Sequence, residues 1–265
     1  MKRTILIWLL ILGLVLFTPS GSVRAEEGNS APGLENLWSI LFVSGHKQEQ
    51  SGMTHEETVA AFRELGITIP DEAVSDTERS MKAMNARIGG SGISWGEQPW
   101  DFALMLLDRV GWGAFDYETG EWTPTSSDVY AFDAEVFNIC HMYTLFLEGV
   151  SSIVPGFVCT DVTEVIDEWD EAKIKAEYPE PFLRHPEGTV TVRFTLNGYA
   201  HEMELNYYGD WFDETAIDKI NEILALEGFP GRLRAYMDGG QGVILFYGDD
   251  AFAARLEEIV PTPYR

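Results

Sequence analysis

Apolar residues recur along this chain with two different periods, and the change of period divides the sequence. From residue 34 to about 177 they follow the three- and four-residue spacing of amphipathic helices, whereas from residue 189 they alternate with polar residues as in strands. The pattern predicts an α+β protein with a mainly helical domain, 34–177, and a second domain, 189–260. Between them, three prolines in the segment 178–188 predict a linker, because proline disrupts both helices and strand pairing.

The helical domain is expected to contain several short helices and one small hairpin. The predicted helices cover residues 34–43, 54–66, 71–88, 99–111, 134–149 and 160–171, and the hairpin covers 115–123. Thr54 and Glu57 match a capping box, in which each side chain bonds an amide of the other residue. Asp133 is expected to cap the helix 134–149, whose apolar residues cover most of its circumference and place it inside the domain.

The helix predicted over 160–171 has the clearest amphipathic spacing. Val162, Val165, Ile166 and Trp169 are spaced as one helical stripe. The other side is acidic, as expected for a solvated helix face.

In the second domain, the elements are expected to follow the order ββαββα. Thr189–Leu196 and Tyr199–Leu205 flank Asn197-Gly198, a dipeptide typical of two-residue hairpin turns. Such a turn places Arg193 opposite Glu202, an opposite-charge pair across the strands. A helix after Asp213, a second hairpin over 233–247 and a last helix capped by Asp249 or Asp250 complete the domain. We expect a four-stranded antiparallel sheet with helices on one face, folding independently of the first domain.

The first 25 residues have the pattern of a secretory signal peptide. Lys2 and Arg3 precede the apolar run Ile5–Phe17, and Val23-Arg24-Ala25 supplies small residues before a cleavage site after Ala25. The alternative is a retained membrane anchor, but a run of 13 residues is shorter than the roughly 20 that span a bilayer. We therefore expect a secreted, extracellular protein without a stable membrane anchor, beginning with a flexible segment, 26–33.

The chain is strongly acidic. Its net charge is −25, and because the first 25 residues hold three basic and no acidic side chains, their removal leaves −28. This balance argues against nucleic acid as a partner, since phosphate binding needs clustered Lys and Arg. It favours a cation or a basic partner, and an acidic solvated surface without a specific role is the alternative.

Two cysteines, Cys140 and Cys159, are present. In an exported protein, two thiols predict one disulfide, and two separately buried thiols are the alternative. The predicted return of the chain after the helix 134–149 is what would bring the two together.

Known catalytic and cofactor motifs are not found. His55-Glu56 and His201-Glu202 begin like a zinc-protease helix, but neither has the second histidine four residues on. No P-loop, nucleophile elbow or dinucleotide fingerprint occurs. We therefore predict no metal and no cofactor, and we interpret His201 as a packed or rim histidine on a strand.

The segment 95–122 is the best candidate site. Four of the seven tryptophans beyond the signal peptide lie there; the candidate ligand-binding residues are Trp95, Trp100, Trp112, Trp122 and Tyr117. Aromatic faces beside acids make platforms for sugars or extended peptides. The alternative is that these rings fill the core of a domain built from short helices.

Acids of the same segment suggest a possible chemistry. Asp101, Asp116, Glu118 and Glu121 are close enough in sequence to form paired carboxylates for glycoside hydrolysis. The leading hypothesis is nevertheless a secreted, acidic, non-enzymatic protein that binds a protein or glycan ligand. The alternatives are an extracellular hydrolase acting on glycan or peptide, and an inhibitor or immunity-type protein for a basic partner.

Overall fold

The structure is a computed structural model, and it describes residues 52–88, 99–116, 122–135, 141–166, 187–208, 211–237 and 241–260. Contacts divide the chain into Met1–Gln48 and Glu49–Arg265, and every described residue belongs to the second unit. The predicted signal peptide 1–25, the flexible segment 26–33, the helix 34–43 and the linker 178–186 lie outside the described residues.

Helices and strands are mixed along the chain, which confirms the α+β class. The helices are α3 (His55–Glu64), α4 (Asp71–Ile88), α5 (Pro99–Gly111), α6 (Met142–Ile153), α8 (Thr215–Leu226) and α9 (Asp250–Ile259). The strands are β1 (Ala114–Phe115), β2 (Trp122–Thr123), β3 (Tyr130–Asp133), β4 (Cys159–Ile166), β5 (Glu187–Leu196), β6 (Tyr199–Tyr208), β7 (Arg232–Met237) and β8 (Gly242–Gly248). Within the described ranges, no helix is both long and apolar enough to cross a membrane.

The strands form two three-stranded antiparallel sheets and the small β1–β2 hairpin. One sheet has the order β4-β5-β6 and the other β3-β8-β7. The two C-terminal hairpins therefore lie in different sheets, and the four-stranded sheet predicted from them is not formed by the described residues. Alternation fixes the pairing inside a hairpin, but it does not say which further strand joins each edge.

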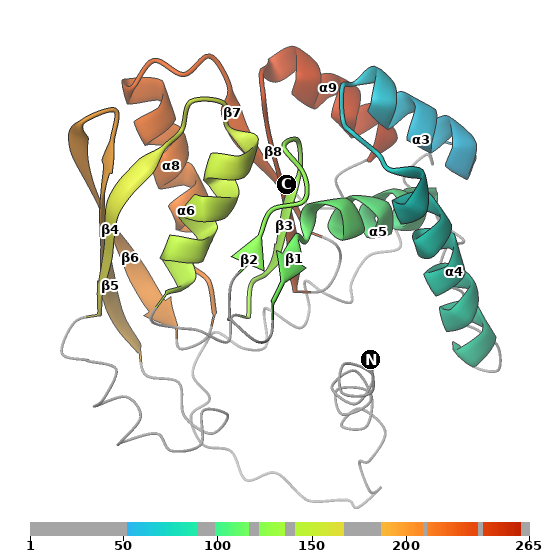
Figure 1. Cartoon of the computed structure of the whole chain (residues 1–265), viewed down its shortest axis with the longest axis horizontal. Helices are drawn as coiled ribbons and strands as arrows, with labels where there is room; N and C mark the ends of the chain where they lie inside the picture. The colour runs from blue at the N-terminus through green and yellow to red at the C-terminus, as the bar shows by residue number, and fades with distance from the viewer. Residues whose placement is uncertain are drawn as a thin grey trace, which may run out of the picture. The chain divides into compact units, whose positions relative to one another are not determined.

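The sheet β3-β8-β7 is buried on both faces. Along β8, Val243 and Leu245 belong to one core cluster, whereas Ile244 and Phe246 belong to another. The second cluster is completed by residues of α3, α4, α5 and α9. The first contains α6 and α8 together with the inward residues of β5 and β6, so these two helices lie between the sheets (Figure 1). Burial on both faces explains why β8 is continuously apolar and central, as predicted.

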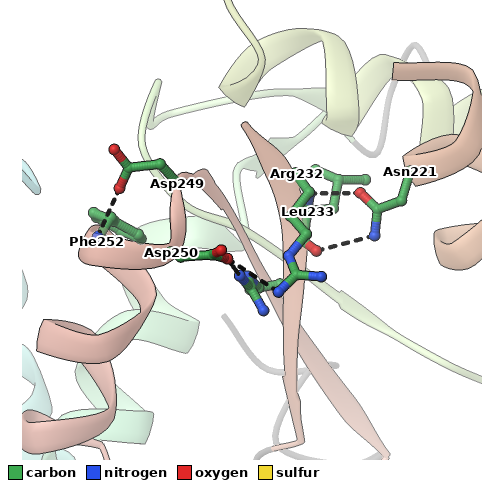
Figure 2. A network of polar contacts seen from close by, with 7 residues as sticks. Asn221, Arg232, Leu233, Asp249, Asp250 and Phe252 are labelled. Atoms are coloured by element: carbon green, nitrogen blue, oxygen red, sulfur yellow. Dashed lines mark hydrogen bonds and ion pairs between the residues drawn. The ribbon is translucent and has the colours of Figure 1, made fainter. Parts of the chain in front are cut away.

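Polar contacts fix the ends of the second sheet (Figure 2). Asn221 of α8 accepts from the Leu233 amide at 2.7 Å and donates to the Leu233 carbonyl at 3.1 Å, so its side chain bonds β7 much as a neighbouring strand would. The Asp250 carboxylate oxygen Oδ1 accepts hydrogen bonds from the guanidinium groups of Arg232, at 3.1 Å, and Arg234. Asp249 accepts from the Phe252 amide at 2.8 Å, which confirms it as the cap of α9.

Several local predictions are confirmed. The capping box of Thr54 and Glu57 begins α3. The hairpin β5–β6 turns at Asn197-Gly198, both with positive φ, and has the predicted register throughout. Arg193 Nε lies 2.6 Å from Glu202 Oε2.

The helix predicted from Asp133 is wrong at its start. Asp133 is the last residue of β3, paired with Gly242, and the helix α6 begins at Met142. The short strand was missed because it continues directly from a polar loop and its four residues show little alternation. The inward position of α6 is confirmed, since Tyr143, Phe146 and Val150 are buried among its core residues.

The helix predicted over 160–171 is also wrong, because its first part is the strand β4. Five of the eight residues of β4 are β-branched, which favours a strand. A bulge between Thr160 and Thr163, with Asp161 at φ 55°, shifts the alternation and produces the spacing that looked helical. Beyond the bulge, Glu164 and Ile166 turn inward and Val165 is exposed.

Both sheets combine strands from the two sides of the Pro-rich segment. β4 and β3 precede it in the chain, and each pairs with a strand that follows it. The predicted domains 34–177 and 189–260 thus share one core cluster, in which Phe146 and Val150 accompany Val192 and Leu245.

Candidate functional site

Of the five candidate ligand-binding residues, Trp112 and Trp122 have described side chains, and they lie at the two sides of the β1–β2 hairpin. Trp112 directly follows α5, and Trp122 begins β2. Trp95 and Tyr117 lie outside the described residues, and Trp100 is in α5 but its side chain is outside the description. The structure therefore brings two of the five predicted ligand-binding residues together and leaves the other three as predictions.

Trp112 and Trp122 are tied through the main chain. The Trp122 indole Nε1 donates to the Trp112 carbonyl at 2.8 Å. Gly113, between Trp112 and β1, has φ 74°, and a Cβ there would lie 2.5 Å from Trp122 Nε1. Only glycine allows this close approach and this conformation together.

The two rings have different surroundings. Trp112 is 44% exposed, whereas Trp122 is half-buried and packs against the core with its ring 5.5 Å from that of Tyr130. Tyr130 continues the contact inward to Phe132, at 5.1 Å. Trp122 thus packs against the core, while the ring of Trp112 is exposed and its main chain is held by the bond from Trp122.

The acids of this segment are only partly described. Asp116 follows β1 and is exposed, while the side chains of Asp101, Glu118 and Glu121 lie outside the description. Across the described residues, no group of three or more His, Cys, Asp or Glu side chains is arranged to hold a metal ion.

A groove between α6 and the start of β4 is a second candidate site, which sequence reasoning missed. It has a volume of about 330 Å³. Its lining residues are Thr144, Leu147, Glu148, Ser151, Phe157, Val158, Cys159 and Val162. Because residues 160–171 were interpreted as a helix, no strand was expected beside α6, and the groove had no signal in the sequence.

Glu164 lies next to this groove and holds the start of α6. Its Oε1 accepts from both the amide and the hydroxyl of Thr144, each at 2.6 Å. The residue at the helix N-cap, His141, makes no capping bond with its side chain. Glu164 supplies that bond from the neighbouring strand, where a carboxylate also meets the positive end of the helix dipole.

The environment of Glu164 disfavours the negatively charged form of its side chain. Burial raises its pKa above the usual range, and hydrogen bonds from Thr144 and the Tyr143 amide, together with the charge of His141, offset only part of that effect. Its second oxygen, Oε2, is buried and has no hydrogen-bond partner among the described residues. Buried acceptors without a donor are uncommon in folded proteins, so this atom calls for an explanation.

Cys159 is a free thiol at the edge of the same groove. The predicted disulfide with Cys140 is thus not present in the structure, and Cys140 lies outside the described residues. Burial raises the pKa of the Cys159 thiol to about 12, which makes it a poor nucleophile near neutral pH.

His201 has the packed position expected of it. Its ring is 5.6 Å from that of Phe194 across the hairpin, and its Nε2 lies 3.2 Å from Glu227 Oε1 at the end of α8. Both side chains are nearly buried, at 8% and 11% exposure. This pair joins β6 to α8.

A smaller hollow of about 180 Å³ lies beside α5 and is lined in part by Arg109, Thr125 and Ser126. Arg109 is engaged with α4, since it donates to Ser80 at 3.0 Å and lies 3.5 Å from Asp76. Thr125 donates to the Val110 carbonyl at 3.3 Å. These contacts hold α4, α5 and the following loop together.

No protein-family model matches this chain, and comparisons with curated proteins and with solved structures find no significant similarity. The functional argument therefore rests on the geometry described above.

Proposed function

We propose that this protein is a secreted, acidic binding protein that recognises a ligand through the exposed ring of Trp112. The N-terminal signal pattern supports export, and the net charge of −28 without the first 25 residues supports a soluble protein rather than a nucleic-acid binder. Sequencing the N-terminus of the exported protein tests the first part, because cleavage after Ala25 gives a chain that begins at Glu26.

The observation that carries the proposal is the exposure of Trp112 on an ordered support. A large ring left 44% exposed loses favourable burial, and a binding surface is a common reason for this. The hydrogen bond from Trp122 holds the main chain of Trp112 in place, so the ring is presented with little loss of freedom on binding. A sugar or a planar peptide group is the ligand such a face suits.

The hydrolase hypothesis depends on the acids of the same segment. Retaining or inverting glycoside hydrolysis needs a second carboxyl roughly 5 to 10 Å from the first. Asp116 is the one acid of the set whose side chain is described, so no distance between two carboxyl groups supports the hypothesis. Its support remains the spacing of the acids in the sequence.

Tryptophan fluorescence during titration with soluble cell-wall and host oligosaccharides tests the proposal. We expect an emission shift that Trp112→Ala abolishes, while the fold is kept because the bond from Trp122 goes to a main-chain oxygen. Trp211→Ala is the matched control, since Trp211 is 38% exposed at a different place. Loss of the shift in both variants, or in neither, would reject Trp112 as the binding residue.

A further inference from the structure

Among the described strands, β4 is an edge of its sheet. β5 pairs with it on one side, and no described strand pairs with its other side. Beyond the bulge, pairing with β5 runs from Thr163 to Ile166, where Val165 is 49% exposed. An edge of this kind presents unpaired amides and carbonyls to an incoming extended chain.

The α6–β4 groove lies at the start of this strand, where Cys159 and Val162 line it. Its apolar lining includes Leu147, Phe157 and Val158, and Val158 is 67% exposed. Glu148, an exposed acid on α6, stands in its wall. The groove therefore combines an apolar floor with a negative charge at its side, which suits a long side chain with an apolar stem and a cationic end.

The orphan oxygen of Glu164 is an independent sign of a cationic group. Thr144 lines the groove and donates to Glu164 Oε1, while Oε2 is buried without a donor. An ammonium or guanidinium group that entered beside Thr144 would supply this donor and pair with the charge.

We propose that β4 and the α6–β4 groove bind an extended segment of a basic partner protein, which adds a strand to the edge of β4 and places a Lys or Arg side chain in the groove. Strand addition takes its affinity from main-chain hydrogen bonds and its specificity from pockets for alternate side chains. Here the edge Thr163–Ile166 supplies the main-chain hydrogen bonds. Glu148 and Glu164 supply the selectivity for a cationic side chain. The site is separate from the Trp112 surface and does not depend on it.

A second copy of this chain is a less suitable occupant. Two copies would bring Glu148 and Glu164 of each chain to the same edge, and each chain carries a net charge of −25. A basic partner is attracted by the same charge, and its association should slow and weaken as salt is added.

Calorimetric titration of the exported protein with the peptide Val-Thr-Val-Lys-Val-Thr-Val tests the proposal. We expect binding that is lost when norleucine replaces the lysine, and that Glu148→Gln weakens about two- to fivefold, the range for one exposed charge pair. Glu222→Gln is the matched control, because Glu222 is also an exposed acid on a helix but lies on α8. Equal affinity for the norleucine peptide, or equal effects of the two substitutions, would overturn the proposal.

Hydrogen exchange locates the bound peptide and keeps the test decisive if Glu148→Gln alters stability. With bound peptide, amides of Thr163–Ile166 should gain protection in the unaltered protein. Protection confined to other strands, or a dimer forming in place of a peptide complex, would contradict strand addition at β4. Trp112→Ala should leave peptide binding unchanged, so failure of this proposal and failure of the glycan proposal are distinguishable.

Discussion

Glu164 caps a helix to which it does not belong. The capping box of Thr54 and Glu57 was predictable because both partners lie within one turn of the chain, and the structure confirms it. The contact between Glu164 and Thr144 joins residues 20 apart, on a strand and a helix. No local pattern encodes such a contact, so this part of the candidate site could not be predicted from the sequence.

The raised pKa of Glu164 makes a prediction about stability and pH. Its folded-state pKa lies above its unfolded value of about 4.5. Above that pH the folded protein therefore keeps a proton that the unfolded chain loses, and the free energy of unfolding falls as pH rises. In Glu164→Gln, the amide oxygen still accepts from Thr144 and no buried charge forms. We expect the variant to gain stability relative to the unaltered protein as pH rises from 4 to 8.

Urea unfolding at several pH values measures this difference. Glu222→Gln serves as the control, since it removes an exposed carboxyl group of α8 and should show no comparable trend. A difference between Glu164→Gln and the unaltered protein that does not change with pH would show that the Glu164 carboxylate is not disfavoured in the fold.

At the scale of elements, the hairpin β5–β6 and the strand β4 show what the sequence could predict. Asn197-Gly198 fixes a two-residue turn, and the alternation on both sides agrees with it, so every register position followed. In β4 the bulge interrupts the alternation after Thr160, and the remaining apolar residues have a helical spacing by coincidence. The β-branched composition of β4 was the signal that would have corrected the assignment.

The turn of this hairpin gives a second prediction. Gly198 has φ 83°, and a Cβ there would meet nothing within 4 Å, so the cost of Gly198→Ala is conformational rather than steric. A left-handed conformation costs an L-residue roughly 1 to 2 kcal/mol, and we expect a loss of that size in unfolding free energy. Gly188→Ala is the control, because Gly188 is in β5, has open space and has no positive φ. Equal losses in the two variants would show that the turn conformation is not the cause.

For the whole molecule, the α+β class was predictable, but the number of strands and the assembly of the sheets were not. Strand and turn patterns identified both C-terminal hairpins, and the continuous apolar run Val243–Tyr247 indicated the central position of β8. Each hairpin is completed by a strand from the earlier part of the chain, β4 or β3, and long-range pairing of this kind leaves no periodic signal. The candidate groove between α6 and β4 depends on that pairing, which is why it was found only in the structure.

This mixed assembly predicts that residues 187–260 do not fold alone. Without the earlier part of the chain, β5 loses β4 and β8 loses β3. The apolar faces of Val192 and Leu245 then lose α6, and those of Ile244 and Phe246 lose α5 and α3. The exposed apolar surface and two new sheet edges favour aggregation over a stable fold.

Urea or thermal unfolding of this fragment, followed by circular dichroism, decides the question. We expect no cooperative transition in residues 187–260, whereas residues 49–265 should unfold cooperatively. Mixing separately expressed 49–177 and 178–265 should restore structure, because the missing strands are then supplied from outside. A cooperative transition in the isolated fragment would instead support an autonomous second domain, and it would show that β3 and β4 each join a hairpin that is already stably folded.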